Sequence, residues 1–499
     1  MGNAHDPASR PRRPAGGGSE DAAAGEPPAA RALVDARALA AVAALSLSTF
    51  VQNGFLYPPL EARAPWALAA CGLAYAAAFA LWALAAHRRR KPLPTTALSA
   101  VACAALAAGA ALWVAAAAMG YPAGLAAPAV ALLSCGRAWA VVVAGLSLTG
   151  LRPRGVLVTV AGGVFLSYIA YLALGAVLAA LAPVLYALLP MAALAVTTGP
   201  VARSRASLAS GPGELAVTNP GSFPGPFNRL FVCIFLFEVG FGLSIEFGAD
   251  AGAWWTMAVP GAALLAVAAW CARTRSTRRE DALFHVSALL VVFGFLMSSA
   301  QTALFGTVAQ QALAVGAQTF NVLTWAVLSI VAARNPAGGV TALGQGFCAS
   351  NLGATVGVVL GQASSSGDAL AGDVRLLVLA LVAAAFVGYV WMGLRGFSFT
   401  DAIQGVKPVE EVAPPAPESR TDIEARCERL ARAHGLTERE GEVFALLARG
   451  RNGAFIQEEC RVTRNTAKTH IRHIYQKLGV HTQQELIDLV EGDAAGDAA

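Results

Sequence analysis

Residues 96–119 read TALSAVACAALAAGAALWVAAAAM and contain no charged side chain. An α-helix rises about 1.5 Å per residue, so about 20 apolar residues cross the ~30 Å hydrocarbon core of a bilayer. This stretch therefore predicts a membrane-spanning helix. The whole chain agrees with that prediction, because its 499 residues are 56% hydrophobic and 13% charged, with a mean hydropathy of +0.56. Such values exclude an ordinary soluble globular protein.

Eleven other apolar stretches have a similar length, which predicts twelve spans between residues 38 and 395. The connection near 198–228 is rich in Gly, Pro and Ser, and it divides the spans into two sets of six. The twelve stretches run near 38–57, 65–86, 96–119, 122–149, 155–174, 177–197, 229–248, 254–272, 282–302, 310–333, 340–362 and 375–394.

Basic residues fall in every second connection between the predicted spans. Cytoplasmic connections carry an excess of Lys and Arg, so this alternation indicates an orientation. We expect an inner (plasma) membrane protein with both termini in the cytoplasm. The side expected outside holds Arg63 and Arg375. The cytoplasmic side is expected to hold Arg88, Arg89, Arg90, Lys91, Arg152, Arg154, Arg203, Arg205, Arg273, Arg275, Arg278, Arg279 and Arg334.

The regions flanking the predicted membrane domain are polar. Residues 1–30 are rich in Ala, Gly and Pro, which predicts a disordered cytoplasmic tail. Four prolines between residues 408 and 417 indicate a stiff linker over 396–420. We expect a soluble domain over 421–491 and a short disordered tail over 492–499.

The soluble domain carries helix signals from residue 436 onward. Residues 436–491 read LTEREGEVFALLARGRNGAFIQEECRVTRNTAKTHIRHIYQKLGVHTQQELIDLVE, and local patterns divide them into four helices. Thr437 with Glu440 forms a capping box, a short second helix covers Ala454–Cys460, and Thr463 caps a third helix that ends before Gly479. The remaining signals are Gly450 at the end of the first helix and a second capping box of Thr482 with Glu485.

The third helix has one apolar face and one donor-rich face. Four apolar residues recur at i, i+4, i+7 and i+11 and predict a buried stripe. The opposite face carries side chains that can bind phosphates and base edges in a major groove. Residues 460–484 contain five Arg or Lys, three His and no Asp or Glu, which predicts a one-sided positive patch. The stripe is Ala467, Ile471, Ile474 and Leu478, and the donor-rich face is Asn465, Lys468, Thr469, Arg472 and Gln476.

This domain resembles the LuxR-type helix-turn-helix family. The motifs that carry the resemblance are Leu436-Thr-x-Arg-Glu440, Gly450, Ile456, Thr463, Thr466-x-Lys468-x-His470 and Lys477-Leu-Gly-Val480. The resemblance implies that the third helix enters the major groove of double-stranded promoter DNA, with Lys468, Thr469 and Arg472 facing bases. It also implies a homodimer on DNA, formed through the fourth helix. The candidate DNA-binding residues are Thr463, Arg464, Asn465, Thr466, Lys468, Thr469, His470 and Arg472.

The whole chain is similar to membrane-bound LuxR-type regulators whose twelve-span N-terminal domain is like the major facilitator superfamily. The six-plus-six layout carries this second likeness, although residues 87–91 lack the Gly-x-x-x-Asp pattern usual after the second span of such transporters. The implied fold is all-α, with a polytopic helical bundle in the lipid bilayer followed by a four-helix helix-turn-helix domain.

Two isolated charges lie inside predicted spans. Arg137 falls in the fourth span and Glu238 in the seventh, where a charge costs about 2.5–3.5 kcal/mol on insertion scales unless it has a partner. We expect a charge pair, a contact with an unknown small-molecule ligand, or a structural role. Gly353, Gly357 and Gly361 recur every four residues, which predicts close helix packing.

Two functions remain open from the sequence. The leading hypothesis is a one-component transcriptional regulator, whose membrane bundle senses a ligand or a membrane state and whose C-terminal domain binds DNA. The alternative is a transporter with an appended regulatory domain, for which Glu238 is the deeply placed carboxylate. An enzyme is not expected, because no catalytic group or phosphate-binding glycine loop is recognisable. The spacing of Cys and His predicts no metal site, and no cofactor is expected.

Overall fold

The computed structural model divides the chain into two compact units, Met1–Val409 and Glu410–Ala499. The boundary lies inside the predicted 396–420 linker. The predicted tail 1–30 and most of that linker lie outside the residues that the structure describes. These are 33–63, 66–88, 93–209, 228–245, 255–274, 276, 278–298, 303–336, 338–365, 371–389, 398–399, 420–451, 453–460 and 462–496. Within these ranges the chain is helical, with no strand.

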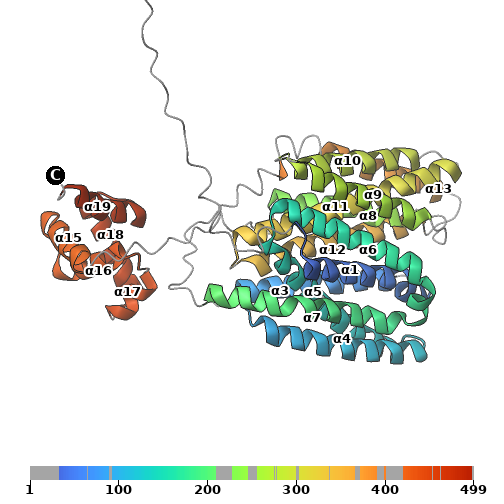
Figure 1. The fold of residues 1–499 in the computed structure, drawn as a ribbon, viewed down its shortest axis with the longest axis horizontal. Coiled ribbons are helices and arrows are strands. Elements are labelled where there is room, and N and C mark those ends of the chain that lie inside the picture. The colour runs from blue at the N-terminus through green and yellow to red at the C-terminus, as the bar shows by residue number, and fades with distance from the viewer. Residues whose placement is uncertain are drawn as a thin grey trace, which may run out of the picture. The chain divides into compact units, whose positions relative to one another are not determined.

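The first unit is a bundle of long helices (Figure 1). Its first half contains α1 (Ala36–Val51), a π-helix (Gln52–Leu56), α2 (Tyr57–Glu61), α3 (Ala67–His87), α4 (Thr95–Ala118), α5 (Ala123–Ser147), a 3₁₀ turn (Leu148–Gly150), α6 (Pro153–Ala180) and α7 (Ala182–Ala209). Its second half contains α8 (Arg229–Ile245), α9 (Trp255–Arg273), α10 (Arg279–Ser298), α11 (Ala303–Arg334), α12 (Gly339–Ser365) and α13 (Ala371–Gly388).

Ten helical segments among the described residues are long and apolar enough to cross a membrane. They coincide with ten of the twelve predicted stretches. The other two stretches, 229–248 and 375–394, coincide with α8 and α13 but extend beyond the described residues, so the count of twelve stays a prediction. Large apolar side chains on the outside of the bundle are exposed, among them Leu289 at 69% and Leu304 at 71%. A surface of this kind fits a lipid environment.

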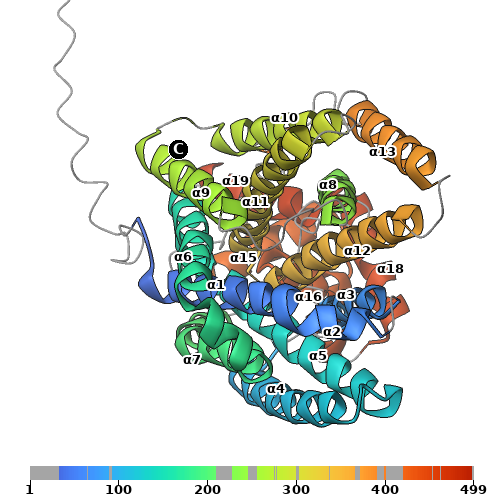
Figure 2. The ribbon, with the colours of Figure 1, turned by 90° about the vertical axis from the view of Figure 1, so that its right-hand side faces the viewer.

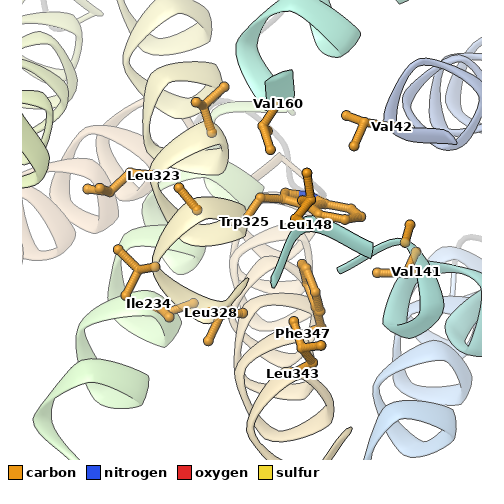
Figure 3. Close-up of a cluster of buried hydrophobic side chains, with 14 of the residues drawn as sticks. Val42, Val141, Leu148, Val160, Ile234, Leu323, Trp325, Leu328, Leu343 and Phe347 are labelled. Atoms are coloured by element: carbon orange, nitrogen blue, oxygen red, sulfur yellow. The ribbon is translucent and has the colours of Figure 1, made fainter. Parts of the chain in front are cut away.

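The two halves of the bundle meet in a common apolar core. Between the halves, α3 packs against α12 and α6 packs against α9, as the view in Figure 2 shows. Among the ten candidate spans, those of α5 and α11 are the most deeply buried. Figure 3 shows part of the common core, with Leu323 and Ile234 of the second half on one side, Val42 of the first half on the other, and Trp325 and Leu148 between them.

Helices α8 and α12 approach each other closely. A Cβ atom on Gly353 would lie 2.2 Å from the carbonyl oxygen of Phe235, and one on Gly357 would lie 2.2 Å from that of Val239. A side chain at either position would therefore overlap the backbone of α8. The predicted close packing is confirmed at these two glycines.

Arg137 and Glu238, for which a charge pair was one of three expected roles, each contact residues of their own half of the bundle. Arg137 on α5 donates to Gln52 and Thr49. The side chain of Glu238 on α8 lies against α12, beside Gly353. No ion pair joins the two residues, both of which the structure describes.

The described residues of the second unit form five helices. They are α15 (Arg420–Ala433), α16 (Glu438–Ala448), α17 (Gly453–Glu459), α18 (Arg464–Leu478) and α19 (Gln483–Gly496). The last four are the predicted helices, whereas α15 was not predicted. The last helix continues to Gly496, past residue 491 where the sequence predicts the domain to end.

Candidate nucleic-acid interface

A single apolar core holds the five helices of the C-terminal unit together. Phe444 on α16 and Ile474 on α18 are fully buried in it. Burial of these side chains fixes the face that α18 turns inward, and therefore the face that it presents to solvent. The core consists of Cys427, Val443, Phe444, Leu447, Ile456, Ala467, Ile474, Leu478, Val480, Leu486 and Val490.

Helix α18 begins and ends as its sequence predicts. The hydroxyl of Thr463 accepts a hydrogen bond from the backbone N–H of Thr466 at 3.3 Å, which caps the helix. Gly479 ends it with φ of 71°, a left-handed conformation that favours glycine. The turn before α18 is held by the N–H of Val462, which donates to the carbonyl oxygen of Gln457 on α17 at 3.1 Å. These contacts make α17 and α18 a helix-turn-helix pair.

Most of the predicted DNA-binding residues lie on the exposed face of α18. His470 is half-buried, and the hydroxyl of Thr469 donates to the carbonyl oxygen of Asn465 at 2.9 Å. The side chain of Arg464, like the whole of Arg461, lies outside the described residues. The exposed residues are Thr463, Asn465, Thr466, Lys468, Thr469 and Arg472.

Ile471 departs from the predicted buried stripe. The stripe holds for Ala467, Ile474 and Leu478, which are buried, but Ile471 is only half-buried. Its side chain contributes to an open groove of about 700 Å³ beside the C-terminal end of α18. The other groove residues are Lys468, Arg472, Tyr475, Gln476, Gly479, Val480 and His481.

The basic side chains of α18 that the structure describes fall into two groups. Lys477 donates to the carboxylate of Glu440 at 2.6 Å and to the carbonyl oxygen of Gly435 at 3.0 Å. His473 also approaches Glu440, at 3.7 Å. Lys468 and Arg472 belong to no ion pair among the residues that the structure describes. Their charges are therefore available to an external anion, whereas that of Lys477 is neutralised.

The carboxylate of Glu440 joins α16 to α18 by the hydrogen bonds that it accepts. Its carboxylate accepts the N–H of Thr437 at 2.9 Å, and its own N–H donates to the Thr437 hydroxyl at 3.3 Å, which completes the predicted capping box. The hydrogen bond from Lys477, followed by that from Thr437, lowers the pKa of Glu440 to about 2. The second capping box is only partly formed, because Glu485 accepts the N–H of His481 in place of that of Thr482.

Two features of the unit were missed from the sequence. Helix α15 packs on α16 and α19, and its buried Cys427 with half-buried Leu430 and Ala431 shows a helical spacing that could have revealed it. Gln483 donates to the carbonyl oxygens of Leu447 at 3.0 Å and Arg451 at 3.1 Å, which ties α19 to the end of α16. No local pattern marks that long-range contact.

Comparison with known proteins identifies this unit. Residues 434–490 match the family model of bacterial regulatory proteins, luxR family. The HTH-type transcriptional regulators MalT of Yersinia pestis (strain Pestoides F) and Serratia proteamaculans (strain 568) are each similar to this chain, with 45% identity over 58 residues. The matched segment covers 12% of this chain and 6% of either relative. The C-terminal unit is thus a LuxR-family helix-turn-helix domain, which implies DNA-binding transcription regulation.

Proposed function

We propose that the chain is a membrane-embedded one-component transcriptional regulator, in which the helical bundle senses a ligand or a membrane state and the C-terminal unit binds promoter DNA. The main support for this proposal is that one chain contains both a bundle with ten candidate membrane spans and a LuxR-family DNA-binding domain. Both termini are expected in the cytoplasm, where the second unit reaches the chromosome.

In this proposal α18 is the recognition helix. Lys468 and Arg472 stand one helical turn apart on its exposed face, with Thr469 beside them, so they can reach base edges in one major groove. Contacts to the DNA backbone would come from Thr466 and His470. The remaining predicted residues, Thr463, Arg464 and Asn465, lie at the N-terminal end of α18, where backbone N–H groups favour phosphate. Two copies are expected to bind as a homodimer.

A contact at the end of the bundle supports the proposed coupling. The hydroxyl of Ser398 and the N–H of Phe399 donate to the carboxylate of Asp281 at the start of α10, at 2.8 and 2.6 Å. The Phe399 ring is 1% exposed and lies 5.1 Å from that of Phe284, which in turn lies 5.9 Å from that of Phe237 on α8. A rearrangement of α8 or α10 would therefore move the start of the predicted linker.

The test of DNA recognition uses residues 410–499, which form a compact unit with their own core. Binding of the fragment to DNA upstream of its own gene and of neighbouring genes is measured at fixed salt. Lys468→Ala and Arg472→Ala should each weaken binding about ten- to a hundredfold, because a base-edge contact contributes about 1–3 kcal/mol. Arg432→Ala is the matched control, since Arg432 is an exposed arginine of α15 paired with Glu428. Wild-type affinity in both α18 variants would refute the recognition-helix assignment.

A transporter with an appended regulatory domain is the second candidate. The packing of α3 on α12 and of α6 on α9 favours it. The predicted second span then contacts the eleventh and the fifth contacts the eighth, so that the second span of each six-span half meets the fifth span of the other. Deletion of residues 410–499 separates the two candidates. A transporter keeps changing the cellular level of its substrate without that unit, whereas a regulator loses its effect on every metabolite that its target genes control.

A further inference from the structure

A buried polar cluster surrounds Arg137 in the first half of the bundle. The guanidinium of Arg137, which is 5% exposed, donates to the side-chain oxygens of Gln52 at 3.2 Å and of Thr49. Its central carbon lies 4.9 Å from the ring centre of Tyr75 and 5.7 Å from that of Tyr186. Four separate helical segments thus converge on one cation.

Among the residues that the structure describes, Arg137 has no negatively charged partner. No carboxylate among the described residues pairs with it, and its Nε has no hydrogen-bond acceptor there. A buried charge is costly unless it is paired, and inside a membrane such residues mark ligand or ion sites. Neutral oxygens and tyrosine rings reduce this cost, but they leave one full positive charge uncompensated.

The backbone beside the cluster is also unusual. Helix α1 changes at Gln52 into a π-helix, Gln52–Leu56, and such segments occur frequently at functional sites. The amide nitrogen of Gln52 donates to the hydroxyl of Tyr57, which turns the amide oxygen toward Arg137. Gln52 therefore fixes the guanidinium from one side without neutralising it.

The surroundings of the cluster indicate what kind of ligand would neutralise the charge of Arg137. Tyr186 belongs to a cluster of buried apolar side chains that also includes Val51, Leu56 and Leu133. A single cation matches one negative charge better than two, which favours a carboxylate over a phosphate. The tyrosine rings offer contact area to an apolar or aromatic body.

We propose that Arg137, Tyr75 and Tyr186 form the binding site for a small organic carboxylate with an apolar body. This inference rests on the proposed function, in which the bound carboxylate is the signal that the bundle senses. Arg137 holds the carboxylate by charge-assisted hydrogen bonds. The hydroxyls of Tyr75 and Tyr186 supply further donors.

The test follows the thermal unfolding of the purified full-length protein in detergent. The probes are 3-phenylpropionate and octanoate, each compared with its neutral amide, and inorganic phosphate. At least one carboxylate should raise the unfolding temperature with saturation, whereas the amides and phosphate should not. Arg137→Gln should weaken this binding about ten- to a hundredfold, as expected for loss of an ionic hydrogen bond. The matched control is Arg154→Gln, because Arg154 lies outside the cluster and donates a hydrogen bond to the carbonyl oxygen of Cys271.

Further variants keep the test decisive if Arg137→Gln folds poorly. Arg137→Lys retains the charge and should bind more weakly than wild type, and Tyr75→Phe should weaken binding several-fold while keeping the ring. Equal stabilisation by acid and amide, no stabilisation by either carboxylate, or unchanged binding in all three variants would overturn the proposal. DNA binding by residues 410–499 is measured separately, so a failed carboxylate site with intact Lys468-dependent DNA binding leaves the regulator standing.

Discussion

Glu440 connects two helices of the DNA-binding unit that lie far apart in the sequence. It caps α16 through Thr437 and accepts a hydrogen bond from Lys477 on α18. Glu440 is only 5% exposed, so removal of one partner would leave a buried charge uncompensated. This contact fixes the angle at which α18 is presented.

The stability of residues 410–499 should therefore depend on pH in the acid range. The folded-state pKa of Glu440 is lowered from 4.5 to about 2, so its contribution is complete above pH 4.5 and is lost as pH falls toward 2. Urea unfolding followed by circular dichroism should show that Glu440→Gln is less stable at pH 7 by about 1–3 kcal/mol and loses less stability on acidification. Glu442→Gln, at an exposed pair with Arg439, is the control. An unchanged acid dependence in Glu440→Gln would contradict this account.

Ile471 and Ile474 should respond differently to the same substitution. Ile474 is 0% exposed, so Ile474→Asp buries an unpaired charge and should unfold the unit. Ile471 borders the open groove, where water can reach an aspartate, and Ile471→Asp should leave a folded but less stable unit. The helix content of the two variant fragments is measured by circular dichroism. Equal loss of helix in the two variants would be inconsistent with the observed burial.

Residue roles that depend on neighbours along the chain could be predicted, and those that depend on tertiary contacts could not. Thr463 and Gly479 were identified because caps are local signals. The partners of Arg137 could not be identified, because hydropathy shows that a charge lies in a span but not which way its side chain faces. Ile471 was expected to be fully buried because helical periodicity does not reveal that it lies at the edge of the core, beside the open groove.

At the scale of helices, the contact of α8 with α12 depends on the absence of side chains. Gly357→Ala would place a Cβ atom 2.2 Å from the carbonyl oxygen of Val239, so the helices must separate. We expect this variant to show a lower unfolding temperature and less monodisperse protein in detergent. Gly175→Ala is the control, because a Cβ atom at Gly175 on α6 meets nothing within 4 Å. Equal behaviour of the two variants would refute the close packing.

Helices with long apolar sequences were predictable, whereas polar helices and helix ends were not. Hydropathy ends the sixth stretch at residue 197, but α7 continues through Pro200 to Ala209, because a helix can extend beyond its apolar part. Helix α15 follows the Pro-rich segment and is rich in charge, so its few apolar positions were not recognised. The candidate recognition helix was predictable because its caps, its periodicity and its one-sided charge all agree.

For the whole molecule, the alternation of basic connections predicts a topology. Reporter fusions after Arg90, Arg278 and Arg395 should show cytoplasmic activity, and fusions after Asp250 and Asp368 should show the opposite side. The reporters are alkaline phosphatase, which is active outside, and a fluorescent protein that is active inside. A cytoplasmic signal after Asp250 or Asp368 would be incompatible with the twelve-span arrangement.

The central claim is that one molecule holds DNA while it is embedded in a membrane. The most direct measurement is flotation of lipid vesicles that contain the full-length protein, mixed with labelled DNA from around its own gene. We predict that the labelled DNA floats with vesicles that contain the wild-type protein or Arg432→Ala. Vesicles that contain Lys468→Ala or Arg472→Ala should lose most of the DNA, although the protein still floats. Protein that stays at the bottom of the gradient, or vesicles that retain the DNA equally in all four cases, would contradict the claim.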